Sequence, residues 1–427
     1  MNSNTNERSR VTSEVRHLLR AQLASQAYKS VLDIWPGDPR YLALGEQFSP
    51  LCLPLGYDRT LEQSFEWRPG AESNGFFLVL GASGSGKTET LKALGSGIVN
   101  RGFPVLVLDF HGDVTFPGLN PVLLSSGPGS IVGVNPMDVD CFLDEQVGLY
   151  EQRVRLVEMI QRAVPTLGPR QKMLLQDAIT LAYQRAGFRD DHPATWRNHP
   201  PTFVTVMKIL NAWMEDEGMK HSRQSIPGCI AAIRNEFDHP VFARQQHLTL
   251  DALLRWNVRV DLTRLSESVR YIVAETLLRK VFRALQLMGP IPVDPQNDAE
   301  RFRLFVIVDE AKILTNGRGD IESSAHILNV IATEGRKFGL GLILASQMSS
   351  HFGSEVKANA ASWLVMKPMA MDEAKKNAVN IGVPPQALLD LRGKGDGYYR
   401  TRANPRARQI QVNRLRSSFD GRYEKLD

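Results

Sequence analysis

Short β-branched or aliphatic runs, several of them almost uninterruptedly apolar, constrain the fold of this chain more than any other feature. They occupy residues 76–80, 104–110, 131–134, 258–262, 304–308, 340–345 and 361–366, with helical patterns between them. Strands that are buried on both faces require such runs, because helices cover each side of a parallel sheet. The sequence therefore predicts an α/β fold with a mainly parallel, doubly wound sheet.

Helical periodicity alone marks the region between about residues 141 and 250. Four segments carry it, at 147–164, 169–185, 202–216 and 225–237, and we expect an all-helical insertion there. Two later helices, at 265–287 and 320–338, return the chain to the sheet. Asp320 or a nearby serine is the expected cap of the second.

The chain therefore divides into five predicted segments. An amphipathic pattern at 11–34 predicts a helical extension or partner-binding arm within residues 1–45. The remaining segments are the first part of the α/β core (46–140), the helical insertion (141–250), the second part of the core (251–416) and a tail (417–427).

Composition excludes several classes of protein. Of 427 residues, 43% are hydrophobic and 23% charged, which is typical of a globular chain. The net charge of +5 is too small over this length to indicate nucleic-acid binding unless the excess is local. Cys52, Cys141 and Cys229 form no disulfide or metal pattern, and the nine histidines read as ordinary ones. Without a signal peptide or a membrane-length apolar run, we expect a cytoplasmic protein.

A phosphate-binding motif follows the first apolar run directly. Residues 81–88 read GASGSGKT and fit G-x-x-x-x-G-K-[ST], and a helix-forming stretch at 89–99 comes next. Glycines let backbone N–H groups face the phosphates, Lys87 reaches the β and γ phosphates, and the Thr88 hydroxyl ligates Mg²⁺. The expected nucleotide-binding residues are Gly81, Ala82, Ser83, Gly84, Ser85, Gly86, Lys87, Thr88 and Glu89.

Two further strand ends supply the other groups that nucleotide hydrolysis needs. Asp309 and Glu310 follow the run 304–308, and we assign Asp309 to the metal and Glu310 to the attacking water. Gln347 follows the run 340–345 and is a candidate sensor of the γ-phosphate. Because parallel strands end at one edge of a sheet, Gln347 is expected near Glu310.

Together these residues resemble the HerA-FtsK superfamily of P-loop motor ATPases, in particular its HerA-like and conjugative coupling-protein branches. The segments that carry the resemblance are GASGSGKT (81–88), VLVLDFHGDV (105–114), VGVNPMDVD (132–140) and the run from VIVDEAKIL (306–314) to EGRKFGLGLILASQ (334–347). The family's Asp-Glu-Ala-His is Asp309-Glu310-Ala311-Lys312 here, so both carboxylates are kept.

The resemblance implies a RecA-like core that takes ATP and Mg²⁺ and forms a homo-oligomeric ring, commonly a hexamer. In that family a neighbour's arginine completes each ATP site, and Arg336 is at a similar position. A solvated cation at a helix end is the alternative for Arg336. The segment before the phosphate loop leaves little room for the β-barrel with which HerA proteins usually begin, so we expect a reduced motor that docks on a separate partner.

A local excess of cations lies at 392–416, where eight Lys and Arg residues accompany a single acid. Dense cations favour contact with DNA phosphates, and the candidates are Arg400, Arg402, Arg406 and Arg408. The same alternation around 403–405 fits an edge hairpin whose charges prevent aggregation.

The leading hypothesis is an ATP-driven translocase or helicase-like motor, acting as a ring on duplex DNA. The alternative is a regulatory ring ATPase that scaffolds and activates a partner such as a nuclease, docked through the N-terminal helix. A protein-secretion ATPase is a third and weaker hypothesis.

Overall fold

The computed structural model describes residues 50–138, 148–216, 218, 224–244, 246–315, 326–415 and 423–425. The predicted N-terminal helix at 11–34 and most of the predicted tail lie outside these residues. Among the helices that the structure describes, none combines the length and the apolar character needed to cross a bilayer.

One large sheet organises the described part of the chain. Its strand order is β2-β1-β13-β12-β11-β3-β10-β9-β4-β8-β5, and β14 pairs with β13. Neighbouring strands from β11 to β5 are all parallel, whereas β12, β13, β1 and β2 pair antiparallel. The prediction of a mainly parallel α/β sheet is confirmed. The strands are β1 (Leu53–Asp58), β2 (Gln63–Trp67), β3 (Phe76–Leu80), β4 (Val105–Asp109), β5 (Asn120–Leu123), β8 (Val258–Asp261), β9 (Leu304–Val308), β10 (Leu340–Ser346), β11 (Ser362–Met366), β12 (Asp396–Thr401), β13 (Arg408–Leu415) and β14 (Tyr423–Lys425).

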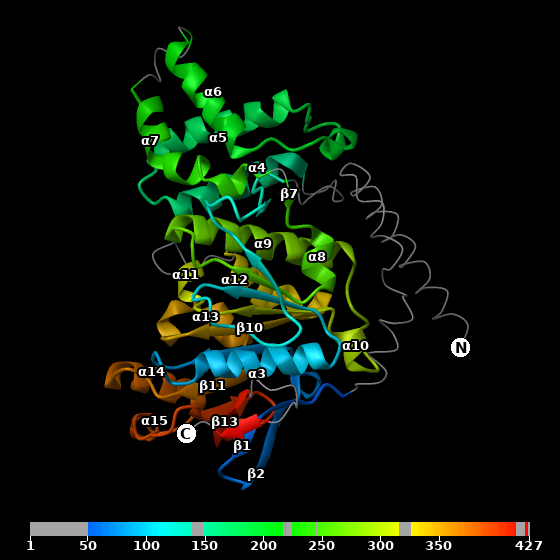
Figure 1. Cartoon of the computed structure of the whole chain (residues 1–427), viewed down its shortest axis with the longest axis vertical. Coiled ribbons are helices and arrows are strands. Elements are labelled where there is room, and N and C mark those ends of the chain that lie inside the picture. The colour runs from blue at the N-terminus through cyan, green and yellow to red at the C-terminus, as the bar shows by residue number, and fades with distance from the viewer. Residues whose placement is uncertain are drawn as a thin grey trace, which may run out of the picture.

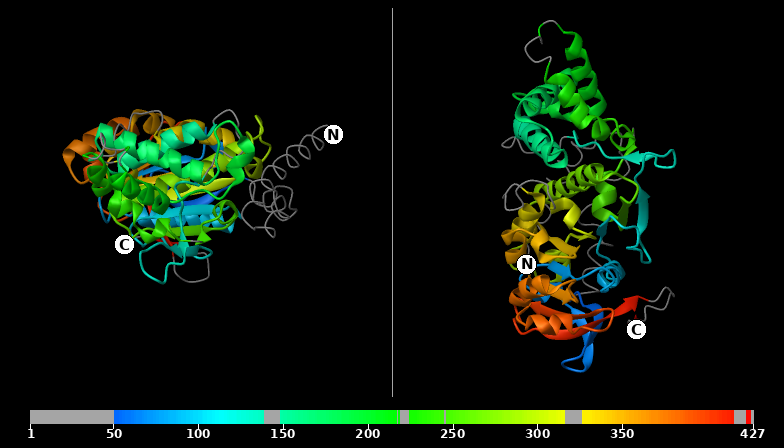
Figure 2. Two further views of the ribbon diagram at one scale, coloured as in Figure 1. Left: turned by 90° about the horizontal axis from the view of Figure 1, so that it is seen from above. Right: turned by 90° about the vertical axis from the view of Figure 1, so that its left-hand side faces the viewer.

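Helices cover both faces of this sheet (Figures 1 and 2). The described helices are α3 (Lys87–Asn100), α4 (Gly148–Ala163), α5 (Pro169–Arg185), α6 (Phe203–Glu215), α7 (Ile226–Phe237), α8 (Leu250–Arg255), α9 (Glu267–Leu287), α10 (Asp298–Arg301), α11 (Lys312–Thr315), α12 (Ile327–Glu334), α13 (Ser354–Asn359), α14 (Met371–Ile381) and α15 (Pro385–Leu389).

Alternate residues of the parallel strands enter two different cores, which explains why the strands are apolar throughout. Phe77 and Val79 of β3 lie in a cluster with α3, whereas Leu78 and Leu80 lie in the cluster that includes α9 and α12. All five residues of β3 are buried. Since successive side chains point to opposite faces, both faces of β3 favour apolar residues.

The antiparallel strands correct one expectation. The predicted hairpin around 403–405 exists as β12 and β13, but it does not form the edge of the sheet, because β1 pairs with β13 and β2 lies beyond it. Its alternation reflects burial that alternates along β12, where Tyr398 and Arg400 are half-buried and Tyr399 and Thr401 are buried. Protection of an edge is therefore the wrong explanation for the arginines of β12 and β13.

Two other predicted elements also differ. The run 131–134 does not join the main sheet; it contains β6 (Val132–Gly133), which pairs in parallel with β7 (Gln246–His247). The helix expected at 320–338 is shorter in the described residues: α12 begins at Ile327, where the His326 ring accepts from the N–H of Leu328. A 3₁₀ turn at Gly335–Phe338 follows it. Asp320 and the neighbouring serines lie outside the described residues.

Helices α4, α5, α6 and α7 pack on one another at the end of the molecule remote from β1 and β2 (Figure 1). Helix α4 packs on α9, and buried charges link them: Arg162 donates to Glu275 at 2.8 Å and to the Tyr271 hydroxyl at 2.8 Å. The Arg162 and Arg279 charges hold the pKa of the buried Glu275 at about 2, although burial alone raises it. The predicted boundaries at 140/141 and 250/251 stay predictions.

Candidate nucleotide-hydrolysis site

The phosphate-binding loop connects β3 to α3 at the carboxyl edge of the parallel strands. Gly84 and Gly86 have φ angles of 76° and 114°, in the region that favours glycine. The N–H of Ala82 donates to the carbonyl of Lys367 at 2.8 Å, so the end of β11 holds one side of the loop. The motif identified in the sequence thus forms a strand–loop–helix unit.

Lys87 begins α3, and its side chain folds back over the loop. Its Nζ donates to the carbonyls of Gly81 and Ala82 at 2.8 and 2.9 Å. Burial lowers the pKa of Lys87, while the charges of Glu310 and Asp309 act in the opposite direction. A desolvated ammonium group surrounded by acceptors is suited to receiving a phosphate oxygen.

The other predicted loop residues are spread around Lys87. Ser83 and Gly84 are exposed, whereas Thr88 is half-buried in the first turn of α3. Glu89 forms an ion pair with Lys92 at 3.0 Å, which occupies its carboxylate within the helix. The helix start, with its unpaired N–H groups, favours an anion at the loop.

Asp309, Glu310 and Gln347 meet beside this loop, as predicted from their strand ends. β10 lies between β3 and β9, so Gln347 lies between Lys87 and Glu310 along the edge. Gln347 Nε2 donates to Glu310 Oε2 at 3.2 Å, and Glu310 Oε1 is buried with no hydrogen-bond partner in the described part of the chain. Glu310 also has a φ of 59°, which a non-glycine residue adopts only at a cost.

A histidine that the sequence analysis treats as ordinary joins the site. His111 Nδ1 lies 2.9 Å from Asp309 Oδ2, and this hydrogen bond raises the pKa of His111. The turn that carries it is built on Asp109, which accepts from the N–H groups of His111, Gly112 and Val114 at 2.7–3.1 Å and from Arg259 Nε at 2.7 Å. Asp109 is therefore fully engaged in shaping the turn after β4.

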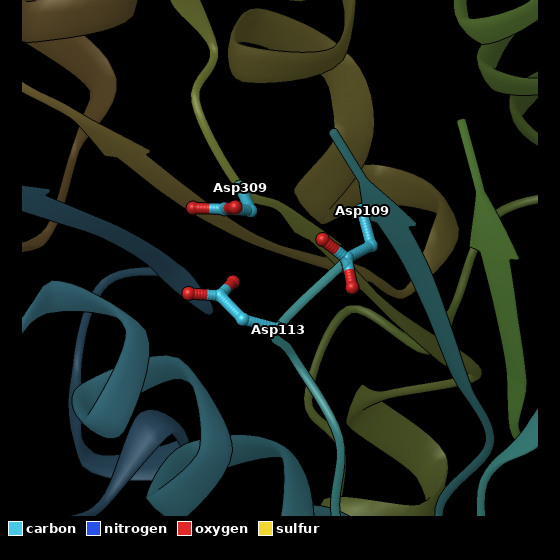
Figure 3. Close-up of side chains that lie close together, drawn as sticks. All are labelled: Asp109, Asp113 and Asp309. Carbon is cyan, nitrogen blue, oxygen red and sulfur yellow. The ribbon is translucent and has the colours of Figure 1, made fainter. Parts of the chain in front are cut away.

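Asp113, at the end of the same turn, is a second residue that sequence reasoning missed. Carboxylate oxygens of Asp109, Asp113 and Asp309 lie within 4.8 Å of one another (Figure 3). Burial raises the pKa of Asp113, and the charges of Asp309 and Asp109 raise it further. The segment 105–114 contributes to the family resemblance, but nothing in its spacing predicts that its turn reaches Asp309.

The residues present fit a magnesium–nucleotide complex. Mg²⁺ takes oxygen ligands and is usually held by one or two protein groups together with phosphate oxygens and water. Thr88 offers a hydroxyl at the start of α3, and Asp309 offers a carboxylate at the end of β9. Glu310 Oε1 adds a buried acceptor without a hydrogen-bond partner in the described part of the chain, next to Asp309.

The remaining predicted residues are remote from this site. Arg336 is exposed and precedes β10, whereas Gln347 follows it, so the seven residues of β10 place them about 20 Å apart. Arg400 donates to the carbonyl of Asn380, and Arg408 donates to Asp58 at 3.4 Å. Arg402 and Arg406 are exposed, with no ion pair in the described part of the chain.

Comparisons with known proteins agree with this fold. Residues 76–281 match the family "Helicase HerA, central domain". Relatives are the DNA double-strand break repair helicases HerA of Sulfurisphaera tokodaii, 21% identical over 70% of this chain and 56% of the relative, and of Saccharolobus solfataricus, 22% identical over 68% and 53%. The chain thus spans about half the length of these relatives.

Solved structures show the same fold. VirB4 of Thermoanaerobacter pseudethanolicus is similar with a TM-score of 0.66 and 18% identity, over 84% of this chain and 96% of that one. The plasmid coupling protein TrwB in complex with ADP and Mg²⁺ is similar with a TM-score of 0.57 and 13% identity, over 82% and 88%. The family match over residues 76–281, the sequence relatives and the phosphate-binding loop together support a P-loop ATPase of the HerA-FtsK type.

Proposed function

We propose that this protein hydrolyses ATP with Mg²⁺ and uses the energy to move along DNA as a homo-oligomeric ring. The observation that carries the hydrolytic part is the convergence of Lys87, Asp309, Glu310 and Gln347 at one edge of the sheet. The DNA part is supported by the helicase relatives. We also propose duplex DNA as the track and the cytoplasm as the location.

The site residues have distinct roles in this proposal. Lys87 exchanges its loop carbonyls for the β and γ phosphates and neutralises charge that develops there. Glu310 orients the attacking water and accepts its proton through Oε1, while Gln347 holds Oε2. Thr88 and Asp309 would hold Mg²⁺, which would supply neutralisation of the phosphate charge.

The position of Arg336 supports the proposal that the protein acts as a homo-oligomeric ring. It lies about one length of β10 from its own Gln347, too far for an arginine side chain to reach. The Arg336 of a neighbouring copy, and not the chain's own Arg336, would complete the site. We propose that it stabilises the charge on the transferred phosphoryl oxygens, as an arginine finger supplied in trans does.

A subunit-mixing experiment tests this arrangement. Arg336→Ala and Lys87→Ala are each expected to bring the ATPase rate to background when assembled alone. In rings assembled from equal amounts of both, half of the loops and half of the neighbouring arginines are intact, so about a quarter of the interfaces are complete. We expect up to about a quarter of the wild-type rate; a background rate in mixed rings would contradict the role in trans.

For contact with DNA, we propose two of the four predicted arginines. Arg400 and Arg408 are engaged within the chain, whereas Arg402 and Arg406 are exposed on the β12–β13 turn. The test compares the steady-state ATPase rate with and without linear duplex DNA, and records the assembly state in parallel. Wild type is expected to be stimulated, and Arg402→Glu with Arg406→Glu is expected to lose stimulation while the basal rate stays. A rate indifferent to every form of DNA would contradict the proposal.

The alternative, a ring that scaffolds and activates a partner, depends on the segment 11–34, outside the described residues. Deleting residues 1–34 separates the two hypotheses. Under the alternative, deletion abolishes assembly with the partner and leaves the ATPase rate intact.

A further inference from the structure

A short turn between α15 and β12 touches the phosphate-binding loop. The N–H of Gly395 donates to the carbonyl of Ser85 at 2.8 Å. A Cβ atom added to Gly86 would lie 2.9 Å from the Gly395 backbone, closer than such atoms approach. The two backbones are therefore in direct contact, and a displacement of the turn moves the loop.

Asp396 holds this turn in shape. Its Oδ2 accepts from the N–H of Gly393 at 2.9 Å, and its own N–H donates to the Gly393 carbonyl at 3.1 Å. Gly395, between them, has a φ of 90° and accepts from the N–H of Val412 in β13 at 2.9 Å. The carboxylate is 3% exposed, so its charge needs a partner.

Arg59 is that partner, and it comes from a different part of the chain. Its guanidinium forms an ion pair with Asp396 at 3.0 Å. Arg59 directly follows β1, and its N–H donates to the Gln409 carbonyl of β13 at 2.8 Å. The β1–β2 hairpin thus connects, through Arg59 and Asp396, to the turn that touches the loop.

We propose that Arg59 and Asp396 are positioning residues of the nucleotide site. Their ion pair fixes the turn 393–395, and the turn fixes Ser85 and Gly86 in the shape in which the loop N–H groups face a phosphate. Neither side chain touches the nucleotide. The inference rests on the proposed function only in taking a nucleoside di- or triphosphate as the ligand.

The test compares Arg59→Ala and Asp396→Asn with a matched control. Asp396→Asn keeps the shape and the acceptor for Gly393 but removes the charge that pairs with Arg59. Arg68→Ala is the control, because it breaks an exposed ion pair with Glu66 at 3.1 Å in the same hairpin, away from the turn. The dissociation constant is measured for the Mg²⁺ complex of a fluorescent ADP analogue, together with the melting temperature of each protein.

We expect Arg59→Ala and Asp396→Asn each to weaken binding about three- to tenfold, and the double variant to weaken it no further than the stronger single one. Arg68→Ala is expected to bind as the wild type does. The inference is overturned if the two variants also bind as the wild type does, whatever their melting temperatures. It is equally overturned if Arg68→Ala weakens binding as much as they do.

Failure of the proposed function gives a different result. If the wild type itself does not bind the ADP analogue, or binds it no better than Lys87→Ala, the ligand is wrong. If the wild type binds the ADP analogue better than Lys87→Ala does, and the Arg59 and Asp396 variants bind it as the wild type does, the proposed ligand is supported. The positioning role of Arg59 and Asp396 is then contradicted.

Discussion

The parallel and the antiparallel parts of the sheet have different tasks. The strand ends of β3, β4, β9 and β10 supply the groups that the hydrolytic proposal uses. The antiparallel strands β1, β2, β12 and β13 supply none of the proposed chemical groups, yet they bring Arg59 and Asp396 to the back of the phosphate-binding loop. In these proposals, the parallel part of the sheet supplies the hydrolytic groups and the antiparallel part positions the phosphate-binding loop.

The packing of the two parts explains the division. Parallel strands with helices on both sides end together at one edge, which gathers side chains from distant parts of the sequence. The antiparallel strands instead contribute large aromatic side chains to the α3 side, where Phe77 of β3 lies 4.9 Å from Trp67 and 5.9 Å from Tyr399 between ring centres. The comparison predicts that substitutions at the strand ends of the parallel part change turnover or nucleotide affinity, whereas substitutions in the core of the antiparallel part change the free energy of unfolding.

The largest effect is expected for Glu310→Gln. Glutamine keeps the size of the side chain and its contact with Gln347 but accepts no proton from water, so we expect kcat to fall about a hundredfold or more. Nucleotide affinity is expected to stay, since Glu310 does not bind the phosphates in the ground state. Single-turnover hydrolysis and equilibrium binding measure the two. A variant that keeps near wild-type turnover would break the assignment of chemistry to the parallel part.

Lys87→Ala is expected to act on binding as well. Loss of the buried ammonium removes the cation that meets the β and γ phosphates, and affinity for a triphosphate analogue is expected to fall about a hundredfold. Lys92→Ala is the control, because Lys92 lies in the same helix and pairs with Glu89 instead. Equal loss in both variants would show that general charge, and not the loop lysine, determines affinity.

Trp67→Ala sharpens the comparison from the antiparallel side. Trp67 is fully buried, and its Nε1 donates to Ser362 Oγ at 3.0 Å. Truncation is expected to lower the free energy of unfolding by about 3–5 kcal/mol, with kcat per folded molecule unchanged. Leu61→Ala, at an exposed position of the same hairpin, is expected to change stability little. Denaturant unfolding and kcat are measured together; a large fall in kcat at wild-type stability would contradict the division.

The smallest effect concerns pH. The hydrogen bond to Asp309 raises the pKa of His111 above its ordinary value of 6.5. Its stabilising contribution is therefore complete below pH 6.5 and is lost as the pH rises through the raised pKa. In the nucleotide-free protein, the difference in unfolding free energy between wild type and His111→Ala is expected to shrink as the pH rises. A difference that grows with pH would contradict the ion pair.

The sequence predicts the parallel part of this molecule far better than the antiparallel part. Strands buried on both faces leave continuous apolar runs, so the sequence alone predicts β3, β9 and β10. The phosphate loop has a fixed spacing and the acidic pair follows a strand, so the sequence also predicts Lys87, Asp309 and Glu310. The alternating burial of β1 and β2 leaves a weak pattern. Arg59 and Asp396 are 337 positions apart in the sequence, and they lie close together because β13 pairs with both β1 and β12.

The same limit explains the residues missed beside Asp309. The turn that carries His111 and Asp113 is shaped by Asp109, whose fourth partner, Arg259, comes from β8. Only the pairing of β4 with β8 brings them together, and a pattern within either strand does not reveal it. The predicted cap at Asp320 or a nearby serine and the predicted helix at 11–34 lie outside the described residues and remain predictions.

Strands β6 and β7 precede and follow helices α4 to α7 along the chain, and they lie side by side as a parallel pair. The chain segments on either side of these four helices are thus separated by a single strand spacing, about 4.8 Å. In evolutionary terms, such a junction lets one helical module be exchanged for another without stretching the sheet beneath it. Helix α9 sets one requirement for such an exchange. Any replacement module must again cover the apolar face of α9 and supply a cation for Glu275.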